Sequence, residues 1–195
     1  MKVFTRTKKL IPSIAALSLA ITLSACSSGS SSSSTTTTTV PSASKSLLQK
    51  GLAAQKAGNY PQARSYYQQA IAADPTNAGN ISAIAYYDMG VIDQRNGNRA
   101  GALANYNKAL ALYPNFQPAL YNTAILNTAT NPTRALELYN RLIVLNPKYA
   151  NALFNSGLLA YQMGNTTLGV QRIKAAIAID PALAKRVPAS VNLNQ

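Results

Sequence analysis

The sequence predicts an all-α protein built as an array of about four helix-turn-helix repeats. One motif recurs with a period of about 34 residues, which is the mark of a repeat architecture. Within the motif a small, a large and an apolar residue are spaced to share one face of a helix, and a proline that ends the helix follows. The four copies begin at Ala63, Ala102, Ala135 and Gly169.

Composition excludes most enzyme chemistry. The chain of 195 residues is 47% hydrophobic, which is enough for one folded domain, but it has no His and a single Cys. His-based acid–base catalysis, Cys/His nucleophile pairs and the usual zinc sites therefore cannot be built. The five acidic residues are spread along the array and form no carboxylate pair. We expect a protein that is not an enzyme, with no catalytic residue, no metal site and no cofactor.

The N-terminus has the pattern of a processing segment. Four cations precede the apolar run 10–23, which is as long as a signal-peptide core and too short to span a membrane comfortably. The run ends in Leu-Ser-Ala-Cys at 23–26, which resembles the bacterial lipobox. This resemblance implies a signal peptide over residues 1–25 and a lipid, such as a diacylglyceryl group with palmitate, on Cys26. The folded part would then be held at the bacterial cell membrane or outer membrane, outside the cytoplasm.

Two other interpretations of Cys26 stay open. A secreted protein cut after Ala25 by ordinary signal peptidase would also fit the small residues. A buried core thiol fits less well, because residues 27–39 are all Ser, Thr or Gly and cannot form a core around it. We expect residues 26–44 to be a flexible tether that lets the folded domain stand off the membrane.

The charge of the chain limits its partners. Lys and Arg number 18 against 5 acids, for a formal net charge of +13. Removal of residues 1–25 takes away only four of these cations. Because the folded part is predicted outside the cytoplasm, we expect no nucleic-acid partner. Anionic envelope polymers, lipid headgroups and acidic proteins remain, as does an ordinary solvated basic surface.

The repeats divide into units with two helices each. Upstream of the motif, three units carry a second apolar helix with a Gly at its middle and another at its end. The later glycines, Gly58, Gly97 and Gly164, suit the left-handed end of a helix. The predicted array covers 45–187, with units at 45–77, 80–116, 117–149 and 150–183, and 188–195 forms a tail.

These motifs resemble the tetratricopeptide repeat family over about residues 45–181. Three departures stand out. The third unit has Ala124 in place of the early Gly and lacks the turn Gly, which puts its turn geometry in doubt. An insertion at 78–82 either lengthens the next helix or adds a loop. Asp93 replaces a packed residue, and we expect it to reach an edge or to pair with a nearby Arg such as Arg95 or Arg99.

The resemblance implies a right-handed superhelix whose first helices line a concave groove. It places six candidate peptide-binding residues there: Tyr87, Asp88, Tyr121, Asn122, Phe154 and Asn155. The Asn amides would hold the backbone of an extended peptide, and the aromatic rings would pack on its side chains. Alternatively, the rings are ordinary interhelical packing and the amides are only solvent-exposed. The cationic clamp that grips a chaperone's C-terminal carboxylate is absent, since Ile84, Pro118 and Asp88 occupy its places.

The function predicted from the sequence is a membrane-anchored interaction scaffold or assembly factor of the bacterial envelope. Its partner would be an extended segment of another envelope protein. The alternative is a structural tether whose basic surface grips an anionic envelope polymer. The last unit has no full capping helix, so we expect the apolar tail residues Val187, Val191 and Leu193 to fold back over it. Coverage of that face by a partner chain, and hence self-association, stays an alternative.

Overall fold

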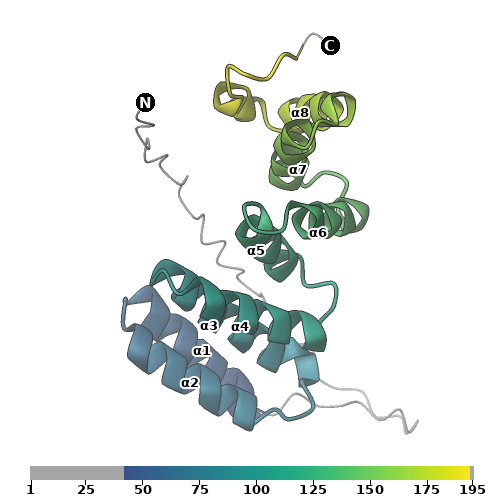
Figure 1. The fold of residues 1–195 in the computed structure, drawn as a ribbon. Helices are drawn as coiled ribbons and strands as arrows, with labels where there is room; N and C mark the ends of the chain where they lie inside the picture. The colour runs from purple at the N-terminus through teal and green to yellow at the C-terminus, as the bar shows by residue number, and fades with distance from the viewer. Residues whose placement is uncertain (1–41, 194–195) are drawn as a thin grey trace, which may run out of the picture. The chain divides into compact units, whose positions relative to one another are not determined.

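The computed structural model describes residues 42–193, and every regular element in this range is helical. The α-helices are α1 (Ser42–Lys56), α2 (Tyr60–Ala72), α3 (Ile81–Arg95), α4 (Arg99–Leu112), α5 (Gln117–Asn127), α6 (Pro132–Leu145), α7 (Ala150–Gln162) and α8 (Thr166–Ile179). Two short 3₁₀ helices, η1 (Ala78–Asn80) and η2 (Pro181–Arg186), complete the range. Figure 1 shows the helices as consecutive pairs, α1 with α2 through α7 with α8. The predicted all-α repeat fold is confirmed.

Each pair is held by the large residue of its second helix. The rings of Tyr67 and Tyr106 are fully buried. Each lies against the mid-helix glycine of its own unit: a Cβ added to Gly51 would come 2.4 Å from the Tyr67 ring, and one on Gly90 would come 2.6 Å from Tyr106. Glycine at this position therefore lets the two helices approach closely.

The turns between paired helices repeat one device. Gly58, Gly97 and Gly164 have φ angles of 79°, 75° and 90°, which confirms their predicted left-handed conformation. An Asn side chain then caps the second helix by accepting a hydrogen bond from the backbone three residues later. The capping residues are Asn59, Asn98, Asn131 and Asn165.

The turn between α5 and α6 forms without glycine. No residue between Thr128 and Asn131 has a positive φ. Instead the Thr128 hydroxyl donates to the Ala124 carbonyl at 3.0 Å, and the Asn131 N–H donates to the Asn127 carbonyl at 2.8 Å. From α4, the Arg99 guanidinium donates to the Leu126 carbonyl and the Thr130 hydroxyl. These bonds satisfy the end of α5 in place of a left-handed residue.

The insertion adds a loop turn before α3. Asn77, Gly79 and Asn80 all have positive φ angles around η1. The buried Asp74 carboxylate closes this turn, accepting hydrogen bonds from the N–H of Ala78 at 2.7 Å and of Ser82 at 3.3 Å. Asp74 is therefore a structural cap at the start of α3.

The C-terminal residues cover the last unit as predicted. Leu183 of η2 is buried, and Val187, Val191 and Leu193 pack against the α7–α8 core. The Tyr161 hydroxyl also donates to the Ser190 carbonyl at 3.3 Å. The tail thus replaces a capping helix.

The N-terminal predictions fall largely outside the described range. The signal peptide 1–25, Cys26 and residues 27–41 of the tether all precede residue 42. The predicted start of the array at residue 45 is corrected to Ser42, because Ser44 is already fully buried in α1. Between residues 42 and 193, no helix is long and apolar enough to cross a membrane.

Candidate functional site

The candidate residues lie at equivalent positions of the first helix in each unit. The surface formed by these positions is called the first-helix face. Two adjacent rows run from α1 through α3 and α5 to α7. One is Leu48, Tyr87, Tyr121 and Phe154, and the other is Gln49, Asp88, Asn122 and Asn155. Hydrogen bonds between neighbouring units, described next, show which members the fold brings together.

Asn122 links the second and third units. Its Nδ2 donates to the hydroxyls of Tyr87 and Tyr106, each at 3.3 Å. The side chain is only 8% exposed, so the expectation of a solvent-exposed groove amide is wrong for this residue. The sequence could not show this, because the two acceptors come from other helices. Asn122 helps to hold the array together.

Asn155 repeats the link one unit later. Its Nδ2 donates to the Tyr121 hydroxyl at 3.0 Å, and the residue is half-buried. Asn122 thus uses both N–H groups of its amide within the array and Asn155 uses one, while neither carbonyl oxygen takes a hydrogen bond from the described residues. The expectation that each amide offers a donor and an acceptor to a peptide is corrected to an acceptor only for Asn122.

Tyr87 and Tyr121 combine packing with hydrogen bonding. The Tyr87 ring lies edge-on to Phe116 with a centroid distance of 5.2 Å, and Tyr121 lies 5.3 Å from Tyr149. Both are half-buried, so part of each ring stays accessible. Burial raises the pKa of Tyr87 to about 12 and raises that of Tyr121 further. Both hydroxyls are therefore neutral at physiological pH.

The two ends of the aromatic row belong to the core. Phe154 is 1% exposed, and the Arg186 guanidinium lies 5.1 Å from its ring centroid. The expectation that Phe154 offers its ring to a peptide is therefore corrected. Leu48 is also buried, whereas Leu52, one turn later on α1, is 41% exposed. The accessible part of the face therefore includes Leu52 on α1, Tyr87 on α3, Tyr121 on α5 and Asn155 on α7.

Asp88 occupies the α3 position that Asn122 holds on α5. It is 7% exposed and has no hydrogen bond or ion pair with any described residue. Burial raises the pKa of its carboxyl to about 7. No nearby cation offsets this effect, so the charged form is poorly stabilised within the array.

Asp93 shows the opposite arrangement on the same helix. Its carboxylate accepts hydrogen bonds from Arg64 at 2.8 Å, Asn105 at 2.7 Å and Asn98 at 3.2 Å. The predicted pairing with an arginine is right in kind, but the partner is neither Arg95 nor Arg99. Arg64 comes from α2 of the preceding unit, a contact that sequence distance hides.

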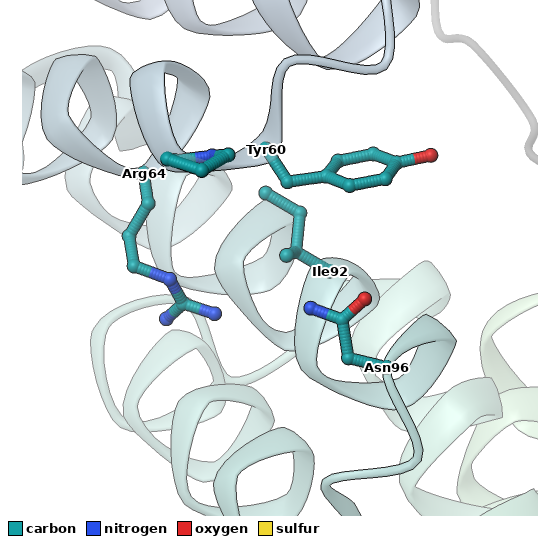
Figure 2. A pocket seen from close by; sticks show the side chains of 5 residues that line it. Tyr60, Arg64, Ile92 and Asn96 are labelled. Atoms are coloured by element: carbon teal, nitrogen blue, oxygen red, sulfur yellow. The ribbon is translucent and has the colours of Figure 1, made fainter.

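A pocket of about 460 Å³ lies between α2 and α3. Figure 2 shows Tyr60 and Arg64 on one side and Ile92 and Asn96 on the other. The lining is mainly apolar, and its only charged group, Arg64, is already paired with Asp93. The pocket therefore carries no set of groups for acid–base chemistry.

Sequence reasoning missed two glutamines that hold the buried tyrosines. The Tyr67 hydroxyl donates to Gln55 Oε1, and the Tyr106 hydroxyl donates to Gln94 Oε1, each at 2.7 Å. The available signal was a Gln twelve residues before the Tyr in both units. Because each of these two hydroxyls donates its one hydrogen to a Gln, neither can donate to another group on the first-helix face.

No metal or catalytic constellation occurs in residues 42–193. That range holds no group of three or more Cys, Asp or Glu side chains close enough to bind a metal ion. The only fully buried side-chain nitrogen or oxygen there without a hydrogen-bond partner is Nη1 of Arg172.

Family comparisons agree with this architecture. Two family models described as tetratricopeptide repeat match residues 42–115 and 126–184, which together are more than half of the chain. The chain belongs to the tetratricopeptide repeat family. Proteins with such repeats are generally non-enzymatic interaction scaffolds.

A known protein resembles part of the chain. The photosystem I assembly protein Ycf3 of Acaryochloris marina (strain MBIC 11017) is 41% identical over 78 residues, which are 39% of this chain and 45% of Ycf3. This chain thus spans less than half of that relative.

Two solved structures share the fold. A tetratricopeptide repeat protein from Parabacteroides merdae has 26% identity and a TM-score of 0.64, and the match covers 71% of this chain and 54% of that one. The first such domain of Spaghetti (RPAP3), bound to the HSP90 peptide SRMEEVD, has 22% identity and a TM-score of 0.55, with 63% and 94% covered.

Proposed function

We propose that the array binds an extended segment of another protein along the first-helix face. The observation that carries this is the pair of carbonyl oxygens on Asn122 and Asn155, one repeat apart, whose amide groups are fixed by tyrosine hydroxyls. Acceptors held in place in this way suit the backbone N–H groups of an extended chain. The half-buried rings of Tyr87 and Tyr121 supply apolar contact beside them.

The relatives support a role in protein binding. Ycf3 is named as an assembly protein, and the Spaghetti domain holds a peptide on the same fold. The chaperone-type cationic clamp is absent here, as the sequence predicts, so the segment bound would differ from an acidic C-terminal tail. We infer an assembly or scaffolding role with a different peptide preference.

The proposal includes anchoring at a bacterial membrane through Cys26. It is supported by the lipobox-like sequence 23–26 and by the Ser/Thr-rich stretch that follows it. Replacing Cys26 by Ala should remove the acylated form and move the protein from the membrane to the soluble fraction. Detergent partitioning and intact mass measure this. An unchanged distribution, with no lipid mass on the native protein, would exclude the anchor and leave peptide binding unaffected.

The binding face can be tested by photocrosslinking in intact cells. A photoreactive residue in place of Gln49, which is exposed on α1, should crosslink to one dominant protein. The matched control is Val144 on α6, which is 80% exposed but lies on a second helix. Capture from Val144 alone would show that the first-helix face is not the binding surface.

Salt dependence separates the proposal from the polymer-tether alternative. Contacts made by apolar side chains and amides should survive moderate salt, whereas attraction of scattered cations to an anionic polymer should be screened. The assay is retention of the crosslinked partner, or of a purified anionic envelope polymer, as salt is raised. Polymer binding that disappears with salt, without any crosslinked partner, would favour the tether.

A further inference from the structure

Asp88 breaks a pattern that its two counterparts follow. Asn122 and Asn155 each stand two residues before the mid-helix small residue of their unit, as Asp88 does, and each donates to a tyrosine hydroxyl of the preceding unit. A carboxylate cannot donate. The hydroxyl that Asp88 would meet, that of Tyr67, already donates to Gln55. The side chain is therefore left without a partner.

The carboxylate is nevertheless open to an incoming group. Asp88 is 7% exposed. Neither of its carboxylate oxygens is among the described side-chain atoms that are fully buried and lack a hydrogen-bond partner, so these oxygens keep some contact with solvent. Its charge acts on the hydroxyls of Tyr67, Tyr87 and Tyr106, which come from α2, α3 and α4. A buried carboxylate near three tyrosines, with no hydrogen-bond donor among the described residues, suits a ligand that brings donors.

The missing counter-charge indicates what kind of ligand fits. Asp93, on the same helix, is neutralised by Arg64. Among residues 42–193, no Lys or Arg lies close enough to Asp88 to oppose the effect of burial on its ionisation. An isolated buried carboxylate is costly until a cation pairs with it. The Asp88 position therefore favours a positive group from a bound partner.

We propose that Asp88 is a specificity residue that receives the ammonium or guanidinium group of a Lys or Arg in the bound segment. This rests on the proposed function. The cation would pair with the carboxylate near the half-buried Tyr87 ring, whose face attracts cations. The Asn122 oxygen, one unit along, would accept from the backbone of the same segment. The overall basic charge of the chain would by itself suggest an acidic partner, but the Asp88 position selects a basic side chain.

The pairing should depend on pH. The tyrosines around Asp88 stay neutral because burial raises their pKa, and Asn122, Gln55 and Gln94 do not titrate. Asp88 is then the group whose ionisation changes near neutrality. Binding of a Lys-containing peptide should strengthen as pH rises through about 7, because ionised Asp88 attracts the cation.

Selection from a phage-displayed library of random peptides on the full chain tests the proposal. We expect enriched peptides to carry Lys or Arg at one fixed place. Asp88→Asn should lose that preference while retaining the other positions of the motif. Glu137→Gln is the matched control, since it removes an exposed carboxylate on α6 and should leave the motif unchanged.

A synthetic peptide from the selection, and its Lys→norleucine analogue, complete the test. The analogue should bind the wild type roughly tenfold more weakly and should bind Asp88→Asn no differently from its parent. Enrichment without a basic position, or an equal loss on both proteins, would overturn the cation site and leave the proposed function standing. Failure to enrich any peptide would overturn both. Should Asp88→Asn not fold, the analogue and the pH dependence on the wild type still decide.

Discussion

Helix α3 carries two buried carboxylates, Asp88 and Asp93, that differ in their hydrogen-bond partners and in the presence of a counter-charge. Asp93 faces α2 and α4, and its oxygens receive Arg64, Asn98 and Asn105. Asp88 acts electrostatically on tyrosines of α2 and α4, Tyr67 and Tyr106, but accepts no hydrogen bond from the described residues. The difference lies in which side chains of these helices lie near each carboxylate. An acidic residue that is fully satisfied stabilises the array, whereas one that is left unsatisfied lowers its stability. In our proposal the cation of a bound segment offsets this cost.

The same substitution should therefore have opposite effects at the two sites. The largest effect is expected for Asp88→Asn, which removes an unpaired buried charge. The shift of its pKa from 3.8 to about 7 corresponds to a gain in the free energy of unfolding of up to about 4 kcal/mol near pH 8. Thermal and urea unfolding of the two proteins measure it.

The pH dependence gives the sign of this prediction. A folded-state pKa raised above the unfolded value makes an acid stabilising at low pH, and that stabilisation is lost as pH rises from about 4 to about 7. The stability difference between Asp88→Asn and wild type should thus be smallest near pH 4 and largest near pH 8. A difference that is constant with pH would show that Asp88 is not the titrating group.

Asp93→Asn should destabilise the array by about 3 kcal/mol, because it leaves Arg64 without its counter-charge. The new amide group would also face the donors of Asn98 and Asn105. Urea unfolding at neutral pH is the measurement. A loss in the free energy of unfolding below about 0.5 kcal/mol would show that the Asp93–Arg64 pair is as weak as an exposed surface ion pair.

A smaller loss is expected at the amide that replaces Asp88 in the next unit. Asn122→Ala removes two hydrogen bonds in a buried position and should lower the free energy of unfolding by about 2 kcal/mol. The control Asn155→Ala removes one bond to Tyr121 at a half-buried site and should cost about 1 kcal/mol. Equal and negligible losses would show that both side chains behave as solvent-exposed amides and contribute nothing to stability.

The smallest effect is expected where a carboxylate is paired but exposed. Arg134 and Glu137 form an i,i+3 pair at 2.9 Å, with more than half of each side chain exposed. Glu137→Gln should cost about 0.3 kcal/mol at low salt and nothing measurable at high salt. Denaturation at both salt concentrations checks this. A cost comparable to that of Asp93→Asn would mean that burial does not explain the contrast on α3.

The sequence predicted the elements that depend on neighbours along the chain. The small-x3-large spacing placed Tyr67 and Tyr106 in the core, and the glycines before Asn59 and Asn98 marked the turns. It misjudged the first helix, because Ser44 looks like part of a Ser-rich tether until its burial is seen. It placed the six candidate residues on one kind of helix, but it could not rank their accessibility.

The sequence alone determined the repeat, the helix pairs and their turns. The signals for them are the spacing of apolar residues, the left-handed glycines and the helix-ending prolines, which act between residues close together in the chain. Which polar groups are satisfied was decided only in the tertiary structure. Arg64 reaches Asp93 across 29 positions, and Asn122 reaches Tyr87 across 35. Hydrogen bonds over such separations depend on how one unit packs on the next, and that packing leaves Asp88 as the buried carboxylate without a donor.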